Sequence, residues 1–212
     1  MPSIKIITPI LGGNYYHIFN RGINRQAIFF EEKNYAYFLH LMKQFVVPYV
    51  SVLAYCLIPN HFHLVIKVKE EILISEGEGI PSLPKDGILI KDEIEIGKWV
   101  SRQYRRMFIT YSMAINKQEN RTGSLLDKNF KRLEITENEY LKYVIYYAHF
   151  NPKKHGLVED FINYKYSSYS AMISEKETNL DRELVYEIFE GEEGFKQYHR
   201  GMHEEQERFI LE

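Results

Sequence analysis

The segment VSVLAYCLIPNHFHLVIKVK, residues 50–69, constrains the fold more than any other part of this chain. Two runs rich in β-branched, aromatic and aliphatic residues flank Pro59 and Asn60, which are typical turn residues. The segment therefore predicts two neighbouring strands joined by a tight turn. The second run carries two histidines, His61 and His63, in otherwise apolar surroundings.

These histidines are separated by one residue, so on a strand their side chains point to the same face. Phe62 and Leu64 then point to the opposite face. Two imidazoles side by side can chelate a divalent metal ion. A strand end with two solvated or hydrogen-bonded histidines explains the same pattern, and the triplet alone favours neither interpretation.

Strand and helix patterns alternate on both sides of the hairpin. A strand ends at Gly22, a helix is expected over 31–45, a second helix over 98–116, and a fourth strand over 129–135. Residues 70–97 are rich in acidic residues, Gly and Pro, which predicts an insertion between the hairpin and the second helix.

A further helix is predicted over 136–152, where Thr136 and Glu139 have capping-box spacing and Pro152 marks the end. The order β-α-β-β-α-β-α predicts an α+β fold, the ferredoxin-like βαββαβ antiparallel sheet with helices on one face. The histidine pair would lie on a central strand. The tyrosine-bearing helix and a C-terminal helical tail complete the predicted architecture.

Charge is segregated along the chain although the total is nearly balanced, with 27 basic and 29 acidic residues. Residues 1–69 and 101–158 have a basic excess, while 70–100 and 159–212 have an acidic excess. A local basic surface for nucleic acid therefore remains compatible with the composition. We expect one domain over 1–170, including the insertion, and an acidic helical tail over 171–212.

Cys56 is the only cysteine, which excludes a disulfide framework and a cysteine metal cluster. No run of apolar residues is long enough to span a membrane, and the first residues do not read as a secretory signal. We therefore expect a cytoplasmic protein without a membrane partner.

The last predicted helix presents a phenol and an amide together. Tyr147 and Asn151 are four residues apart and share a helix face. Tyr143 lies one turn earlier on that face, whereas Tyr146 points elsewhere, so both remain rival tyrosines. A tyrosine-rich amphipathic helix packed on the sheet is the simpler explanation for this helix taken alone.

Tyrosine is a good leaving group once it is joined to phosphorus, which suits reversible exchange of phosphodiesters. A Mg²⁺ or Mn²⁺ ion held by His61, His63 and the amide oxygen of Asn151 would polarise the phosphate. Two imidazole ligands favour Mn²⁺ in binding.

Five ordered motifs together resemble the single-tyrosine HUH transposase family, in which HUH denotes His, a hydrophobe and His. They are YYHIFNRGINRQAIFF, YCLIPNHFHLVIK, NRTGSLLDKNFKR, YYAHFNPKKHGLV and YSSY, between about residues 15 and 170. Asn151 followed by Pro152 favours the REP-associated tyrosine transposase branch. The resemblance implies His61 and His63 as the HUH histidines, Tyr147 as nucleophile and Asn151 as third metal ligand.

The implied activity is a metal-dependent endonuclease and strand transferase that cleaves single-stranded DNA near a hairpin through a 5′-phosphotyrosine intermediate. The basic residues expected to contact DNA phosphates are Arg21, Arg25, Lys131, Arg132, Lys153 and Lys154. A DNA-hairpin-binding protein that keeps the fold without cutting is the alternative. A hydrolytic metalloenzyme is disfavoured, because HFHLVI lacks an Asp-His continuation and no second phosphoesterase motif is present. The sequence leaves open whether the protein is a monomer or a homodimer.

Overall fold

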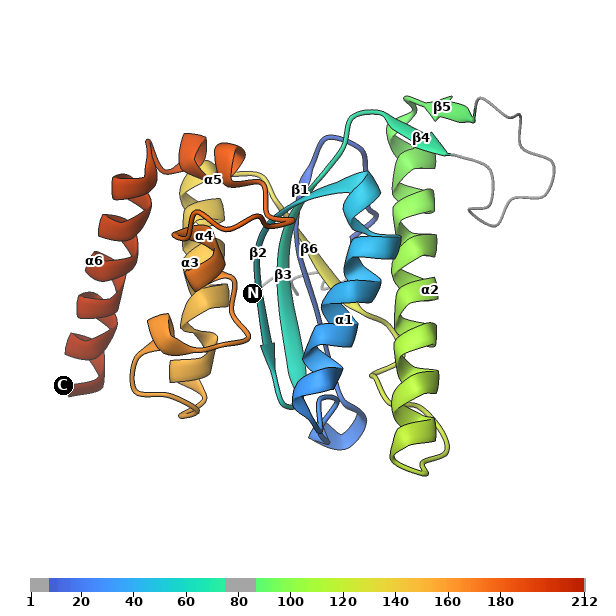
Figure 1. Cartoon of the computed structure of the whole chain (residues 1–212). Coiled ribbons are helices and arrows are strands. Elements are labelled where there is room, and N and C mark those ends of the chain that lie inside the picture. The colour runs from blue at the N-terminus through green and yellow to red at the C-terminus, as the bar shows by residue number, and fades with distance from the viewer. Residues whose placement is uncertain (1–7, 75–86, 212) are drawn as a thin grey trace, which may run out of the picture.

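An antiparallel sheet lies between two layers of helices (Figure 1). The computed structural model describes residues 8–74 and 87–211. The four strands of the sheet lie in the order β2-β3-β1-β6, and their bounds are Tyr15–Arg21 for β1, Val50–Ile58 for β2, His61–Val68 for β3 and Lys131–Ile135 for β6. This order and the antiparallel pairing confirm the predicted βαββαβ arrangement, with the histidine pair on a central strand.

Helices α1 and α2 cover one face of the sheet, whereas α3 and the C-terminal helices lie on the other side (Figure 1). The helices are α1 Glu32–Phe45, α2 Glu93–Gln118, α3 Asn138–Lys154, α4 Tyr169–Met172, α5 Arg182–Ile188 and α6 Glu192–Leu211. Short 3₁₀ turns span Ile23–Arg25, Val47–Tyr49 and Phe161–Asn163. Among the described residues, no helix combines the length and apolar character needed to cross a membrane.

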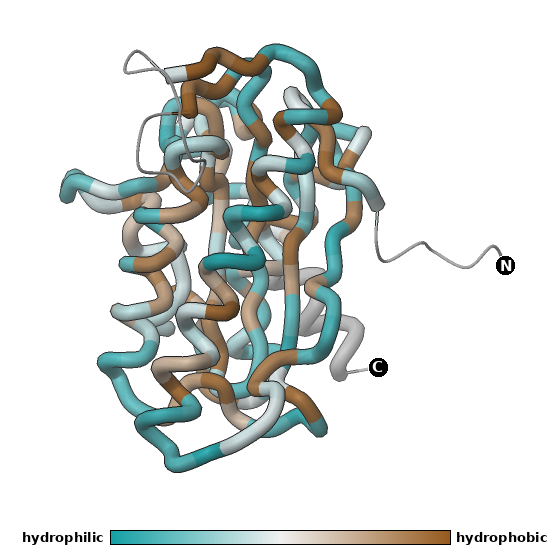
Figure 2. Tube along the Cα trace, turned by 90° about the vertical axis from the view of Figure 1, so that its right-hand side faces the viewer, coloured by the Kyte–Doolittle hydropathy of each residue, from teal (hydrophilic) through white to brown (hydrophobic). Residues whose placement is uncertain are grey.

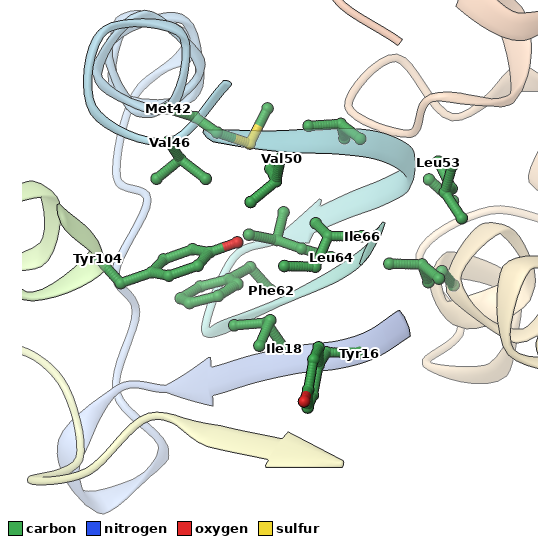
Figure 3. Packing of buried hydrophobic residues seen from close by; sticks show 14 of the residues in the cluster. Tyr16, Ile18, Met42, Val46, Val50, Leu53, Phe62, Leu64, Ile66 and Tyr104 are labelled. Carbon is green, nitrogen blue, oxygen red and sulfur yellow. The ribbon is translucent and has the colours of Figure 1, made fainter. Parts of the chain in front are cut away.

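The core between the sheet and the α1–α2 layer is built on alternate residues of the central strands (Figure 3). Phe62 of β3 is fully buried, and its ring centroid lies 5.0 Å from that of Phe38 in α1 and 5.4 Å from that of Phe108 in α2. Aromatic pairs at such distances add to the stabilisation from burial. These contacts fix which face of β3 is apolar.

Helix α2 begins earlier than predicted, so the expected helix start at residue 98 is wrong. The Asp92 side chain accepts hydrogen bonds from the backbone N–H groups of Ile94 and Glu95, at 3.0 and 2.9 Å, and caps the helix. The last residues of the predicted insertion over 70–97 therefore belong to α2. Within the insertion, β4 (Ile72–Ile74) and β5 (Ile88–Ile90) form a small antiparallel ladder, and residues 75–86 lie outside the described residues.

Helix α3 also differs from the prediction at both ends. Its N-cap is Glu137, which makes no side-chain capping bond, so the capping box expected from Thr136 is wrong. Residue 136 directly follows the end of β6 and remains outside the helix. Pro152 does not end the helix either, since α3 continues to Lys154. A proline inside a helix removes one N–H donor and crowds the carbonyl four residues earlier, yet α3 continues for two residues beyond it.

The C-terminal residues are part of the fold, because a buried chain of hydrogen bonds joins α6 to α3. His199 Nδ1 lies 2.8 Å from the carbonyl oxygen of Phe195, and His199 Nε2 lies 2.9 Å from His149 Nδ1. His149 Nε2 in turn lies 2.7 Å from the hydroxyl of Ser168, which accepts the backbone N–H of Tyr55. The carbonyl oxygen of Phe195 can only accept a hydrogen bond. Every N–H and O–H in this series of hydrogen bonds must therefore point from β2 toward α6.

Gly97 sits where α2 crosses the segment before β1. A Cβ atom at this position would overlap the carbonyl oxygen of Ile10, which is backbone and cannot turn away. We therefore expect Gly97→Ala to lower the free energy of unfolding by about 1–3 kcal/mol, as overpacking typically does. Gly201→Ala in α6 is the control, because no atom lies within 4 Å of its added Cβ, and it should be neutral or slightly stabilising. Urea unfolding measures both, and equal effects would contradict the close contact.

The buried histidine chain makes stability depend on pH. Burial lowers the pKa of His199 to about 4 and that of His149 well below its usual value. In the unfolded chain these two imidazoles bind protons near pH 6.5. The free energy of unfolding is therefore highest above that pH and decreases as the pH falls toward 4. We expect the free energy of unfolding to fall from pH 7 to pH 5 by up to about 1.4 kcal/mol per pH unit for each buried histidine. His199→Leu should destabilise the protein at pH 7 yet reduce this slope, and an unchanged slope would show that His199 is not buried in its neutral form.

Candidate active site

Three rings lie together on the sheet face beneath α3. The register of β1 and β3 places Phe19 opposite His63, and His17 lies two residues before Phe19 on the same face. The ring centroid of His63 is 5.0 Å from that of His17 and 5.8 Å from that of Phe19. Tyr147 of α3 meets this group from the other side, with its ring 5.6 Å from His63. The predicted tyrosine and one predicted metal ligand are therefore adjacent.

These rings line a cleft of about 440 Å³ at the end of the sheet where β3 begins. Its lining residues come from β1 and the turn after it, from β3, β6 and α3: Phe19, Asn20, Arg21, Arg25, Asn60, His61, His63, Lys131, Tyr147 and His155. The cleft is polar and cationic, with no acidic residue in its lining. An anion such as a phosphate suits this lining.

The structure brings the three predicted metal ligands together, although they come from two elements. His61 Nε2 lies 3.2 Å from the Asn151 Oδ1 atom, and the ring centroids of His61 and His63 are 5.1 Å apart. Two neighbouring ligands of an octahedral ion with bonds near 2.1 Å are about 3 Å apart. The separation of His61 and Asn151 is compatible with a shared cation.

The protonation of His61 favours a cation between it and Asn151. Burial lowers the pKa of His61 to about 4; the contact with Asn151 raises this pKa by less than burial lowers it, and the charges of His155, Arg21 and Lys154 lower it slightly further. Neutral imidazole has one N–H, and His61 Nδ1 lies 2.7 Å from the Asn60 Oδ1 atom, a pure acceptor. Asn151 Oδ1, at 3.2 Å from Nε2, is also an acceptor, so the single N–H of neutral His61 can satisfy only one of these two contacts. A cation ligated by His61 Nε2 and Asn151 Oδ1 would allow Nδ1–H to donate to Asn60 and would satisfy both.

His63 presents a second unused lone pair. Its Nδ1 lies 2.8 Å from His17 Nε2, and its Nε2 is buried without a hydrogen-bond partner among the described residues. Burial lowers the pKa of His63 well below its usual value, so the ring is neutral. When Nδ1–H of His63 donates to His17, Nε2 is free to ligate a metal. The donor set therefore fits a divalent ion, and the residues present are those expected from the sequence.

The third ligand predicted for this set is the amide of Asn151. In the part of the chain that the structure describes, no three or more His, Cys, Asp or Glu residues form a metal-binding group. Asn151 is fully buried and its Oδ1 atom faces His61. This amide oxygen would be the hard ligand that complements two imidazoles.

Three of the four tyrosines of α3 were candidate nucleophiles, and their surroundings differ. The Tyr147 hydroxyl accepts a hydrogen bond from Lys154 Nζ at 3.2 Å, and that ammonium group also lies 4.6 Å from its ring centroid. Tyr143 stacks on Tyr147 at 6.2 Å but does not line the cleft. Tyr146 is 1% exposed and packs against Phe150, on the other side of the helix. Of the rival tyrosines, only Tyr147 opens into the cleft.

The six basic residues expected to bind DNA separate into groups. Arg21, Arg25 and Lys131 line the cleft, and Lys154 contacts Tyr147. Arg21 is also paired with Asp127 at 3.0 Å. Arg132 points to the opposite face of β6 from Lys131, toward α2. Lys153 is half-buried and is not in the lining of the cleft.

Sequence reasoning missed two histidines of this site. His17 contacts His63 through the pairing of β1 with β3, which no local pattern reveals. The isolated His17 in the apolar run YYHIF was the available signal. His155 follows α3, and its ring lies 4.8 Å from that of His61.

Comparison with solved structures finds a similar fold in a REP-associated tyrosine transposase bound to a REP hairpin. The TM-score is 0.54, and the match covers 80% of this chain and 84% of that one. The two sequences are 13% identical, so the likeness concerns the fold. No family model matches the chain, and no curated protein matches it in sequence.

Proposed function

We propose that this chain is a metal-dependent endonuclease and strand transferase that acts on single-stranded DNA near hairpins. The main support is that a tyrosine hydroxyl and two histidines line one cationic cleft, with the Asn151 amide oxygen 3.2 Å from one of these histidines. Tyr147 comes from α3, and the ligand nitrogens come from His61 and His63 of β3. A fold shared with a transposase that binds a DNA hairpin adds independent support.

The proposed metal ligands are His61 Nε2, His63 Nε2 and Asn151 Oδ1. Bound Mg²⁺ or Mn²⁺ would supply positive charge at the scissile phosphate and at the departing oxygen. Because α3 contributes both Asn151 and Tyr147, the nucleophile is fixed relative to the ligand set.

In the proposed reaction the Tyr147 oxygen attacks phosphorus, and the bond from phosphorus to the 3′ oxygen breaks. The products are a 5′-phosphotyrosine and a free 3′-OH, whose proton replaces the one that the phenol loses. The exchange conserves the number of phosphate ester bonds, so no external energy source is needed. Attack by a second 3′-OH reverses the step and rejoins strands.

Lys154 and the arginines of the cleft have a complementary role. The Lys154 ammonium group lies beside the phenol oxygen, where it can also donate to a phosphate oxygen held there. Arg25 and Lys131 carry positive charge into the same cleft. These side chains would hold the DNA backbone while Tyr147 reacts.

Substitution of the nucleophile gives the most direct test. Tyr147→Phe should abolish a covalent protein–DNA adduct formed with Mn²⁺ and a library of hairpin-bearing single strands, because the attacking oxygen is gone. A denaturing gel detects the adduct. Tyr143→Phe is the matched control in the same helix and should retain it.

The outcomes of this test separate the alternatives. An adduct that survives Tyr147→Phe would assign the chemistry to another tyrosine and overturn the assignment. A wild-type protein that binds hairpins but forms no adduct, with either metal, would support the non-cleaving hairpin-binding protein instead.

We further propose that His17 positions His63 by accepting its Nδ1–H. His17→Phe keeps an aromatic ring but removes the acceptor, so we expect the affinity for Mn²⁺ to fall by about 10- to 100-fold. His17→Gln places an amide oxygen near the position of the missing nitrogen and should recover most of the affinity. Isothermal titration calorimetry with Mn²⁺ in the absence of DNA measures both. Equal losses in the two variants, at unchanged thermal stability, would contradict the proposed role.

A further inference from the structure

A second hollow surface lies on the opposite side of β6 from the cleft. Two adjoining hollows of about 640 and 750 Å³ follow α2, and both are lined by Ser101, Arg105 and Arg132. We call this surface the α2–β6 groove, and Figure 2 views the molecule from the side on which α2 lies. The proposed reaction uses none of its side chains.

The α2–β6 groove is cationic although the whole chain has a net charge of −2. Its basic lining residues are Lys98, Arg102, Arg105, Lys128 and Arg132. Asp127 is the one acidic residue in the lining of the two hollows, and Arg21 neutralises it at 3.0 Å. Lys98 is paired with Glu95 at 2.7 Å, so the proposal relies on the positive charges of Arg105, Arg132 and Lys128. This charge suits a polyanion.

Large apolar side chains lie beside these cations. Ile109 is 53% exposed and Met113 is 68% exposed, and both line the groove one turn apart on α2. A duplex offers mainly its phosphate backbone to such a surface, since its bases are stacked inside. A single strand offers both phosphates for the arginines and unpaired bases for the apolar side chains. The combination favours single-stranded nucleic acid.

The groove and the cleft that contains Tyr147 lie on opposite sides of the sheet and adjoin at the start of β6. Asn20 lines both the cleft and the groove. Lys131 and Arg132 are consecutive residues of β6 whose side chains enter the cleft and the groove respectively. A strand bound at Tyr147 would pass the start of β6, at Lys131, to enter the groove.

We propose that the α2–β6 groove binds the single-stranded DNA that flanks the cleaved phosphate. This proposal rests on the proposed function, because it takes the cleft as the place of cleavage. It gives a role to the basic side of α2, whose arginines lie away from the cleft.

The test compares DNA hairpins that carry a thymidine flank of about 12 nucleotides with hairpins that carry about three. Flanks on the 5′ and 3′ sides are measured separately by fluorescence anisotropy. Wild-type protein should bind one of the long-flank hairpins at least tenfold more tightly than its short-flank partner.

Arg105→Glu should lower the affinity for that long-flank hairpin at least tenfold more than the affinity for the short one. The slope of log affinity against log salt concentration should become less negative by about 0.7 for each phosphate that the variant no longer neutralises.

Lys43→Glu is the matched control, because Lys43 is exposed on α1 and lines neither the cleft nor the groove. It makes the same change in charge and should affect the affinities for both hairpins equally.

Equal affinities of the wild-type protein for hairpins with long and short flanks would overturn the proposal. So would tight binding of a flank made double-stranded with a complementary oligonucleotide, or equal losses for the two hairpins with Arg105→Glu. Absence of a covalent adduct would count against the proposed cleavage alone, since the flank dependence is measured by binding.

Discussion

The alternation of side chains along β3 is the constraint on which the rest of the structure depends. Phe62 packs into the core under α1 and α2, so His61 and His63 must face the other side of the sheet. A sheet face with buried imidazoles needs a cover that is partly polar. Helix α3 provides that cover and carries Asn151 and Tyr147 on its inner side. The apolar core therefore fixes the geometry of the candidate site.

Burial and charge act in the same direction on the histidines. Desolvation lowers the pKa of His61 and His63, and the positive charge of Lys154 lowers both further. A cleft that attracts a phosphate through cations therefore also keeps its imidazoles neutral. Neutral rings have the lone pairs that a metal ligand requires. In our proposal His17 accepts the Nδ1–H of His63, which leaves the lone pair of His63 on Nε2.

The order of strands and helices was predictable because it rests on local patterns: apolar periodicity, the turn at Pro59 and the i,i+4 spacing of α3. Boundaries were less predictable because local signals compete. Gly97 suggested a break, yet it lies inside α2, where the backbone at Ile10 leaves no room for a side chain. The role of His17 was out of reach of the sequence because it depends on the register between β1 and β3.

The hydrogen-bond chain through His149 gives the C-terminal helices a connection to the site. Helix α3 has two rows of side chains: Tyr147 and Asn151 face the cleft and β3, whereas Tyr146 and His149 face α6. A helix is rigid over one turn, so fixing one row fixes the other. The directional chain from Tyr55 through Ser168 to His199 ties the outer row to both the sheet and α6. The C-terminal helices thus hold α3, which carries the proposed nucleophile Tyr147, against the sheet.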